Sequence, residues 1–355
     1  MPLVDVIVIG AGLSGLLCAR ELQRANFSVV VLESRPRIGG RVWSTAEGTD
    51  LGGSWAWPYD SPQVLALGRE LGVEPVPQLT DGDAFHVRAG GDMSNIGPRG
   101  ASIIPSGPGA VRPRYFEMAK RLSELLVEPV RLGARVTSIT ATDGAIEVAY
   151  GQGLKVQGRR VVVALPPAVL ANIAFSPPLP AAKLEKSKRT ATWCGDWVKL
   201  ALECKSPFWR ETRASGIVAV ASGSAFEVFW EGGDNALVGL GVGPKATAFA
   251  KNAAGDSAAL RAHAVSTLSP VFPRLADELV SATVQAWALE GETYAGPGAT
   301  ERDYGHALLR APTDYGLHFA GTETESHHGH VEGALVAARR AAREVVAALG
   351  ASCRE

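Results

Sequence analysis

The sequence predicts an α/β fold that begins with a Rossmann-like unit and carries a second, inserted α+β domain. Two observations at the N-terminus support this prediction. Residues 4–9 form a short β-branched run typical of a buried strand, and the spacing G-x-G-x-x-G over residues 10–15 follows directly. A second apolar run, residues 28–32, ends at Glu33. A strand, a glycine-rich turn, a helix, a strand and an acid in this order are typical of dinucleotide binding.

The three glycines of the turn have separate expected roles. Gly10 permits the tight turn, Gly12 lets the backbone approach a pyrophosphate, and Gly15 lets helix and strand pack closely. The helix expected over residues 13–24 points its N-terminal amides at the phosphates. The predicted cofactor contacts of this turn are Gly10, Gly12, Leu13, Ser14 and Gly15.

The stretch after the second strand predicts which dinucleotide binds. Glu33 can accept hydrogen bonds from ribose hydroxyls. Gly39 and Gly40 let the backbone curl under a second phosphate, which the guanidinium of Arg41 neutralises. A nicotinamide-dependent dehydrogenase has no use for this second loop, so the pattern indicates FAD. The predicted contacts of this region are Glu33, Ser34, Arg35, Gly39, Gly40, Arg41, Gly53, Ser54 and Trp55.

The chain resembles the flavin amine oxidase family, which includes monoamine and polyamine oxidases. Further segments in the family's order carry this resemblance: Leu132-Gly-Ala-Arg-Val136, Val161-Val-Val-Ala-Leu-Pro-Pro, Trp197-Val-Lys199-Leu with Ser206-Pro-Phe-Trp209, and Phe319-Ala-Gly-Thr-Glu323 with Gly329-His-Val-Glu-Gly333. The resemblance implies a Rossmann-like FAD-binding domain with an inserted α+β substrate domain. It adds these expected FAD contacts: Val136 at the adenine, Trp287 at the flavin, and Gly321, Glu323 and Val331 in the C-terminal signature.

The two domains are expected to be discontinuous. The FAD-binding domain takes residues 1–75, 125–190 and 293–355, and the substrate-binding domain takes residues 76–124 and 191–292. Residues 89–114, rich in Gly, Pro and Ser, are predicted to form a loop. Periodicity predicts helices over 115–128 and from 331 onward, strands over 135–141, 145–150 and 160–165, and in 193–287 strands with one helix at 257–268.

One departure from the family concerns the roof of the pocket. The family usually inserts a longer set of helices between positions 75 and 115 of this chain, where only a short, loop-forming stretch is present. We therefore expect either an open pocket or one that a partner subunit closes, which leaves a homo-oligomer open.

Composition restricts the class of protein. The formal charge of −1 and the hydrophobic content of 46% indicate a globular protein without a basic surplus, so neither nucleic acid nor a membrane is an expected partner. No apolar run reaches the ~18 residues of a membrane span. The four cysteines lack metal or disulfide spacing, and residues 327–330 hold histidines without matching acids, so we expect no metal and a cytoplasmic location.

The resemblance implies that a hydride moves from the α-carbon of an amine to flavin N5 and that dioxygen reoxidises the flavin. The last helix, starting near Val331, would place its positive end at the flavin. Lys199 is ambiguous. Strand alternation alone places it on the face of Trp197 and Glu203, as a solvent-facing lysine. The resemblance implies instead a buried lysine that holds a water at N5 and assists dioxygen.

The substrate pocket is where the sequence differs from monoamine oxidases. Gly298 and Ala299 replace the Cys-Tyr pair that bonds the flavin and flanks the amine, so FAD is expected to bind non-covalently. His330 stands where a second tyrosine would be, as a base or hydrogen-bond donor, or as a histidine bonded to the backbone at a helix start. A one-residue length difference makes His328 the alternative. The predicted substrate contacts are Trp55, Ala299 and His330, with Lys199 and His330 catalytic.

Three functions remain open from the sequence. The leading one is an FAD-dependent oxidase of a small-molecule amine or amino compound, with dioxygen as second substrate. The second is a related flavoenzyme that desaturates a carbon–carbon bond, resembling phytoene desaturases or protoporphyrinogen oxidases. The third is a non-catalytic binding protein on the same fold, similar to Rab-escort proteins.

Overall fold

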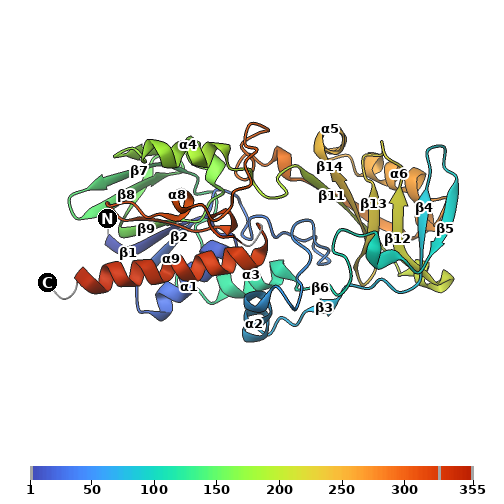
Figure 1. Ribbon diagram of the computed structural model, residues 1–355, viewed down its shortest axis with the longest axis horizontal. Helices are drawn as coiled ribbons and strands as arrows, with labels where there is room; N and C mark the ends of the chain where they lie inside the picture. Colours follow the sequence, from blue (N-terminus) through green and yellow to red (C-terminus); the bar gives the residue numbers. More distant parts are fainter. Residues whose placement is uncertain (1–2, 327–328, 353–355) are drawn as a thin grey trace.

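The computed structural model describes residues 3–326 and 329–352. The molecule is elongated and has two lobes, each organised around one β-sheet (Figure 1). Over the described residues, both of these sheets have seven strands, and a further two-stranded sheet lies between the lobes. The cavity described below lies where the two lobes meet.

The sheet of the first lobe has a parallel core. Its order is β10-β7-β8-β9-β1-β2, with β16 beside β9. β1 pairs in parallel with β2 on one side and β9 on the other, which confirms the predicted Rossmann-like arrangement. The strands are β1 (Leu3–Ile9), β2 (Val29–Leu32), β7 (Val136–Thr142), β8 (Ala145–Tyr150), β9 (Leu154–Val163), β10 (Ala174–Ser176) and β16 (Leu317–Phe319).

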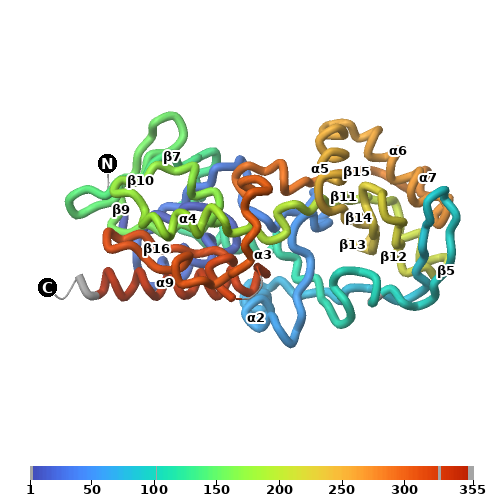
Figure 2. Tube along the Cα trace, turned by 45° about the horizontal axis from the view of Figure 1, so that its top comes forward, coloured from blue at the N-terminus to red at the C-terminus, as the bar shows by residue number. Residues whose placement is uncertain are grey.

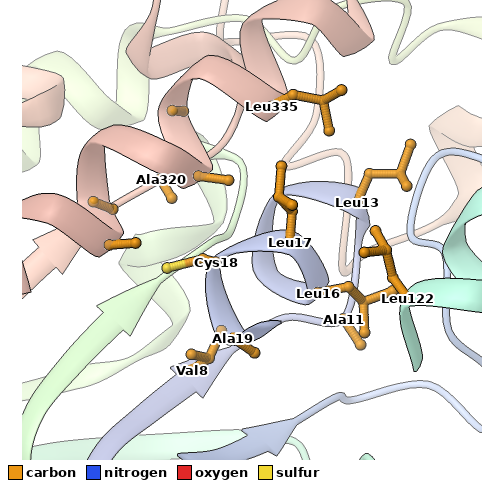
Figure 3. Packing of buried hydrophobic residues seen from close by; sticks show 14 of the residues in the cluster. Val8, Ala11, Leu13, Leu16, Leu17, Cys18, Ala19, Leu122, Ala320 and Leu335 are labelled. Carbon is orange, nitrogen blue, oxygen red and sulfur yellow. The ribbon is translucent and has the colours of Figure 1, made fainter. Parts of the chain in front are cut away.

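Helices cover both faces of this sheet. α1 spans the predicted residues, and its apolar side packs against α9 and α3; Figure 3 shows Leu335 of α9 and Leu122 of α3 meeting the leucines of α1. Glu332, in the first turn of α9, accepts hydrogen bonds at 3.0 Å from the backbone amides of Gln63 and Val64, and so caps α2. The helices are α1 (Leu13–Arg24), α2 (Pro62–Glu70), α3 (Tyr115–Glu124), α4 (Ala181–Arg189), α8 (Ala307–Arg310) and α9 (Val331–Ser352).

The second lobe is a mixed sheet in the order β15-β11-β14-β13-β12-β4-β5. Its strands are β4 (Asp83–Val87), β5 (Met93–Gly97), β11 (Trp197–Cys204), β12 (Ala214–Val220), β13 (Val228–Gly233), β14 (Ala236–Val242) and β15 (Leu279–Ala286), and its helices are α5 (Gly243–Asn252), α6 (Ser257–Leu268) and α7 (Leu275–Glu278). The prediction of a single helix here was wrong. α6 was found, but α5 begins at Gly243-Pro, a pair that resembles a break although proline is well placed in a first helical turn.

Residues 89–114 were predicted as a loop, and the structure differs. β5 forms the outer edge of the second sheet, and β6 (Val111–Arg112) pairs with β3 (Val76–Pro77). Figure 2 shows the chain running back from β5 along the molecule toward α3. α3 ends at Glu124 rather than at 128, and it packs on α1 although the sequence assigned residues 76–124 to the second domain.

Candidate active site

A cavity between the lobes collects most of the residues predicted from the sequence. Both lobes contribute to its wall, because Lys199 lies on β11 of the second lobe and the glycine-rich turn lies in the first. A smaller hollow continues from it, shares Gly10 and Ser34, and adds Val136. The predicted residues that line the main cavity are Gly10, Gly12, Leu13, Ser14, Glu33, Ser34, Arg35, Gly39, Gly40, Arg41, Gly53, Ser54, Trp55, Lys199, Trp287, Gly321, His330 and Val331.

Besides Val136, four predicted residues stand apart from this set. Gly15 and Glu323 lie behind the wall, where Gly15 packs against Gly10 and Glu323 pairs with Arg41. Ala299 is not among the lining residues and lies in a stretch that is largely solvent-exposed, so its place at the substrate stays a prediction. His328 lies outside the described residues.

The glycine-rich turn has the geometry that a dinucleotide requires. A Cβ on Gly10, whose φ is +101°, would lie 2.7 Å from the carbonyl oxygen of Ala164. A Cβ on Gly15 would lie 1.9 Å from the carbonyl oxygen of Gly10, so helix and strand touch there. At Gly12 the nearest atom to an added Cβ is 3.9 Å away, in the direction of Gly39. Gly12 therefore faces open cavity, and the space that a Cβ would fill is available for a pyrophosphate.

Glu33 braces this turn. Its buried carboxylate accepts hydrogen bonds from the backbone amides of Ala11, at 2.8 Å, and Arg35, at 3.0 Å. The side chain of Arg35 donates a hydrogen bond at 2.8 Å to Glu290, which follows β15 of the second lobe. At this dinucleotide end of the cavity, backbone amides fix Glu33, and Glu290 fixes Arg35.

Arg41 is held between the two lobes. Its guanidinium makes a bidentate contact with Glu323, at 2.7 and 3.0 Å, and donates to the carbonyl oxygen of Trp193 at 3.2 Å. Glu323 is fully buried, while the side chain of Arg41 is partly exposed toward the cavity. The sequence placed Arg41 against a phosphate; the structure adds that a carboxylate balances its charge.

Lys199 is buried, with 3% of its surface exposed, and the solvent-facing position predicted by alternation alone was wrong. β11 lies between β14 and β15, and both of its faces are covered. The ammonium of Lys199 donates to the carbonyl oxygen of Gly52 at 2.6 Å and to Ser54 Oγ at 2.5 Å. Burial lowers the pKa of Lys199 to about 8, and burial raises the pKa of nearby Asp50 to about 6.

The start of α9 forms the remaining wall. Val331 and Ala334 line the cavity, so the positive end of this long helix faces it. The imidazole of His330 lies 5.2 Å from the ring of Trp57 and 5.5 Å from that of Trp193, measured between ring centroids. Trp287 is fixed by donation from its indole nitrogen to the carbonyl oxygen of Leu51 at 3.1 Å.

Several wall residues were not predicted. Trp57, Trp193, Cys194 and Tyr115 line the cavity, and the sequence assigned none of them a role there. Their neighbours in sequence show no pattern that indicates a cavity. The only signal was an abundance of tryptophan, eight residues in all, without any order that places them.

Comparison with known families was decisive for classification. The family model of flavin containing amine oxidoreductases matches residues 13–106 and 106–346. The chain belongs to this family. It is therefore an FAD-dependent oxidoreductase of the amine oxidase type, and neither the desaturase nor the non-catalytic alternative is favoured. Within the described residues, no helix is long and apolar enough to cross a membrane.

Individual relatives are distant. Human amine oxidase (flavin-containing) B is 25% identical over 98% of this chain and 86% of its own. That alignment extends over 456 residues against 355 here, so the human enzyme carries segments that this chain lacks. The fold is similar to that of cyclohexylamine oxidase from Brevibacterium oxydans (TM-score 0.79, 21% identity, 98% and 100% coverage) and of putrescine oxidase bound to putrescine (0.76, 21%, 98% and 99%).

Proposed function

We propose that this chain oxidises an amine at the carbon next to nitrogen and that dioxygen takes up the electrons. FAD, which Gly12, Glu33 and Arg41 would hold in the cavity, would supply the two-electron acceptor for the hydride of that carbon and would in turn be reoxidised by dioxygen. The amine leaves as an iminium, which water hydrolyses to a carbonyl compound and ammonia or a smaller amine, and dioxygen leaves as hydrogen peroxide. The buried ammonium of Lys199 in the wall of the cofactor cavity is the observation that carries this proposal.

The chain would contact an extended FAD molecule from one end of the cavity to the other. Gly12 leaves room for the pyrophosphate, Glu33 lies where ribose hydroxyls can reach it, and Val136 lines the hollow beyond. Lys199 and the N-terminal end of α9 concentrate positive potential at the opposite end. This potential stabilises negative charge that develops there, and it also favours a bound amine in its neutral form. A neutral nitrogen is the form whose carbon can release a hydride.

His330 is the residue best placed to act on the amine. Its ring lines the cavity against the rings of Trp57 and Trp193, next to the start of α9. An imidazole can accept a proton from a bound ammonium or donate a hydrogen bond to the substrate near neutral pH. His330→Ala should therefore change turnover or its pH dependence while the FAD content stays full.

The Lys199→Met variant tests the role of the ammonium. We expect reoxidation of the reduced flavin by dioxygen to slow far more than anaerobic reduction by the amine, because the buried cation stabilises charge that moves toward oxygen. In the wild type, the pKa of Lys199, lowered to about 8, means that the ammonium loses its proton as pH rises through 8. Reoxidation should therefore fall above pH 8, and Lys199→Arg should remove that fall.

Stopped-flow measurement of the two half-reactions decides the outcome. Equal rates in wild type and Lys199→Met would leave Lys199 a structural lysine that ties β11 to Gly52 and Ser54. If polyenes or porphyrinogens bleach the flavin anaerobically and no amine of a panel does so, the proposal of amine oxidation is wrong. The chain would then desaturate a carbon–carbon bond.

A further inference from the structure

Three aromatic rings from separate parts of the chain meet at the reactive end of the cavity. The Trp57 ring stacks on the imidazole of His330 with an angle of 28° between planes, and the Trp193 ring meets the same imidazole edge-on at 70°. All three side chains line the cavity. The three rings, Trp57, Trp193 and His330, are called the aromatic wall below.

Both tryptophans are fixed in place by groups outside the wall. The indole nitrogen of Trp57 donates to the carbonyl oxygen of Ser106 at 2.9 Å, and the neighbouring Pro105 also lines the cavity. The backbone amide of Trp193 donates to Glu323 at 3.3 Å. A Cβ on Gly329 would lie 2.3 Å from Cγ of Trp193, so the ring lies directly against the chain that leads into α9. Rings fixed in this way lose little entropy when they bind a ligand.

The acids of the cavity lie elsewhere. Among the described residues that line the main cavity, the carboxylates are Glu33 and Glu292. Glu33 accepts from the glycine-rich turn, and Glu292 pairs with Arg135 beside the hollow that holds Val136. Both therefore belong to the dinucleotide end. Within the part of the chain that the structure describes, the lining of the reactive end offers Lys199, itself a cation, but no carboxylate to balance a second ammonium on a substrate.

We propose that Trp57 and Trp193 determine the specificity of this site, by binding the uncharged, ring-shaped body of a monoamine against the aromatic wall. A flat apolar body gains dispersion and edge-to-face contacts with these rings. A diamine would have to bury its second ammonium beside Lys199 without a counter-ion, which is unfavourable. This inference rests on the proposed amine oxidation, and it names the class of amine.

Binding can be measured without turnover by using amines that have no hydrogen on the α-carbon. We choose 2-phenylpropan-2-amine as the monoamine and 2,5-dimethylhexane-2,5-diamine as the diamine, each titrated by calorimetry into the FAD-loaded protein. We expect the monoamine to bind about tenfold or more tightly than the diamine, a difference within the range of one good aromatic contact and one uncompensated charge.

Variants assign the effect to the wall. Trp57→Ala and Trp193→Ala should each weaken monoamine binding about tenfold and leave the weak diamine binding unchanged, whereas Trp57→Phe should stay within about threefold of the wild type because it retains a ring. Trp43→Phe, at a tryptophan outside the cavity lining, is the matched control and should bind both probes as the wild type does. If Trp57→Ala fails to fold, Trp57→Leu and Trp57→Phe provide the comparison.

The possible failures are distinguishable. Diamine binding as tight as monoamine binding, or unchanged monoamine affinity in both alanine variants, would overturn the specificity proposal even if amines bleach the flavin. If the binding preferences hold but no oxidisable amine, including benzylamine and putrescine, bleaches the flavin anaerobically, the proposed function fails while the recognition by the wall stands.

Discussion

The two ends of the cavity are built in different ways. The dinucleotide end is made largely of backbone from one stretch of chain, in which Gly10 and Gly12 shape the turn and Glu33 holds it through backbone amides. The reactive end is made of side chains from distant segments. There Trp57 meets His330, and Lys199 of the second lobe donates to the carbonyl oxygen of Gly52.

This difference governs how each end tolerates substitution. A turn made of backbone accepts only residues that its local conformation and close contacts allow. A single added methyl group can therefore prevent the turn from forming. A wall of side chains can lose one ring and keep the rest, so its losses are graded. We therefore expect the largest effects at the glycine-rich turn and smaller ones at the reactive end.

Gly15→Ala should give the largest effect. The new Cβ would lie 1.9 Å from the carbonyl oxygen of Gly10, a backbone atom that cannot move without displacing β1 from α1. We expect a loss of more than about 3 kcal/mol in the free energy of unfolding, because overpacking against backbone has no low-energy escape. Urea unfolding of the apoprotein measures it, and FAD binding should be lost as well.

Gly12→Ala is the matched control within the same turn. The nearest atom to its Cβ is 3.9 Å away, and its φ of −72° suits alanine, so the apoprotein should lose about 1 kcal/mol or less. FAD affinity should nevertheless fall by at least about tenfold, since the methyl group occupies the space of the pyrophosphate. Equal destabilisation of both apoproteins would show that Gly12 is also a packing glycine.

The same contrast explains what the sequence could predict. The first turn, α1 and the residues that line the dinucleotide end follow from local spacing, and α1 has the predicted bounds. Lys199 required knowledge of what covers β11, because alternation along one strand does not reveal that both faces are buried. Trp193 reaches the cavity only because the turn before β11 and the segment before α9, at Gly329, come together in three dimensions. The spacing of residues within one segment does not predict contacts between segments that are distant in the sequence.

Glu33→Ala should give an intermediate effect. The variant removes the charged acceptor for the ribose and leaves the buried amide of Ala11 without its partner at 2.8 Å. We expect FAD binding to weaken by about 1.5–3 kcal/mol, the usual cost of losing a hydrogen bond to a charged group. Glu33→Gln keeps an acceptor oxygen for Ala11 but loses the oxygen that accepts from the amide of Arg35, so its apoprotein should keep more stability than Glu33→Ala and less than the wild type, while it loses part of the FAD affinity. Fluorescence titration with FAD measures the affinity of both variants. Wild-type affinity in Glu33→Ala would show that Glu33 does not contact the cofactor.

The smallest effect is expected at Cys194, and it tests whether the reactive end holds the cofactor covalently. Cys194 lines the cavity, so its sulfur is a candidate for attachment, whereas Gly298, which stands at the family's cysteine position, has no sulfur. Burial raises the pKa of Cys194 to about 12, so the thiol keeps its proton near neutral pH and is a poor nucleophile. Acid precipitation should therefore release all FAD from the wild type and from Cys194→Ser alike. Flavin retained by the denatured wild type but released by Cys194→Ser would show that Cys194 bonds covalently to the cofactor. The reactive end would then also hold the cofactor, which the comparison of the two ends assigns to the dinucleotide end.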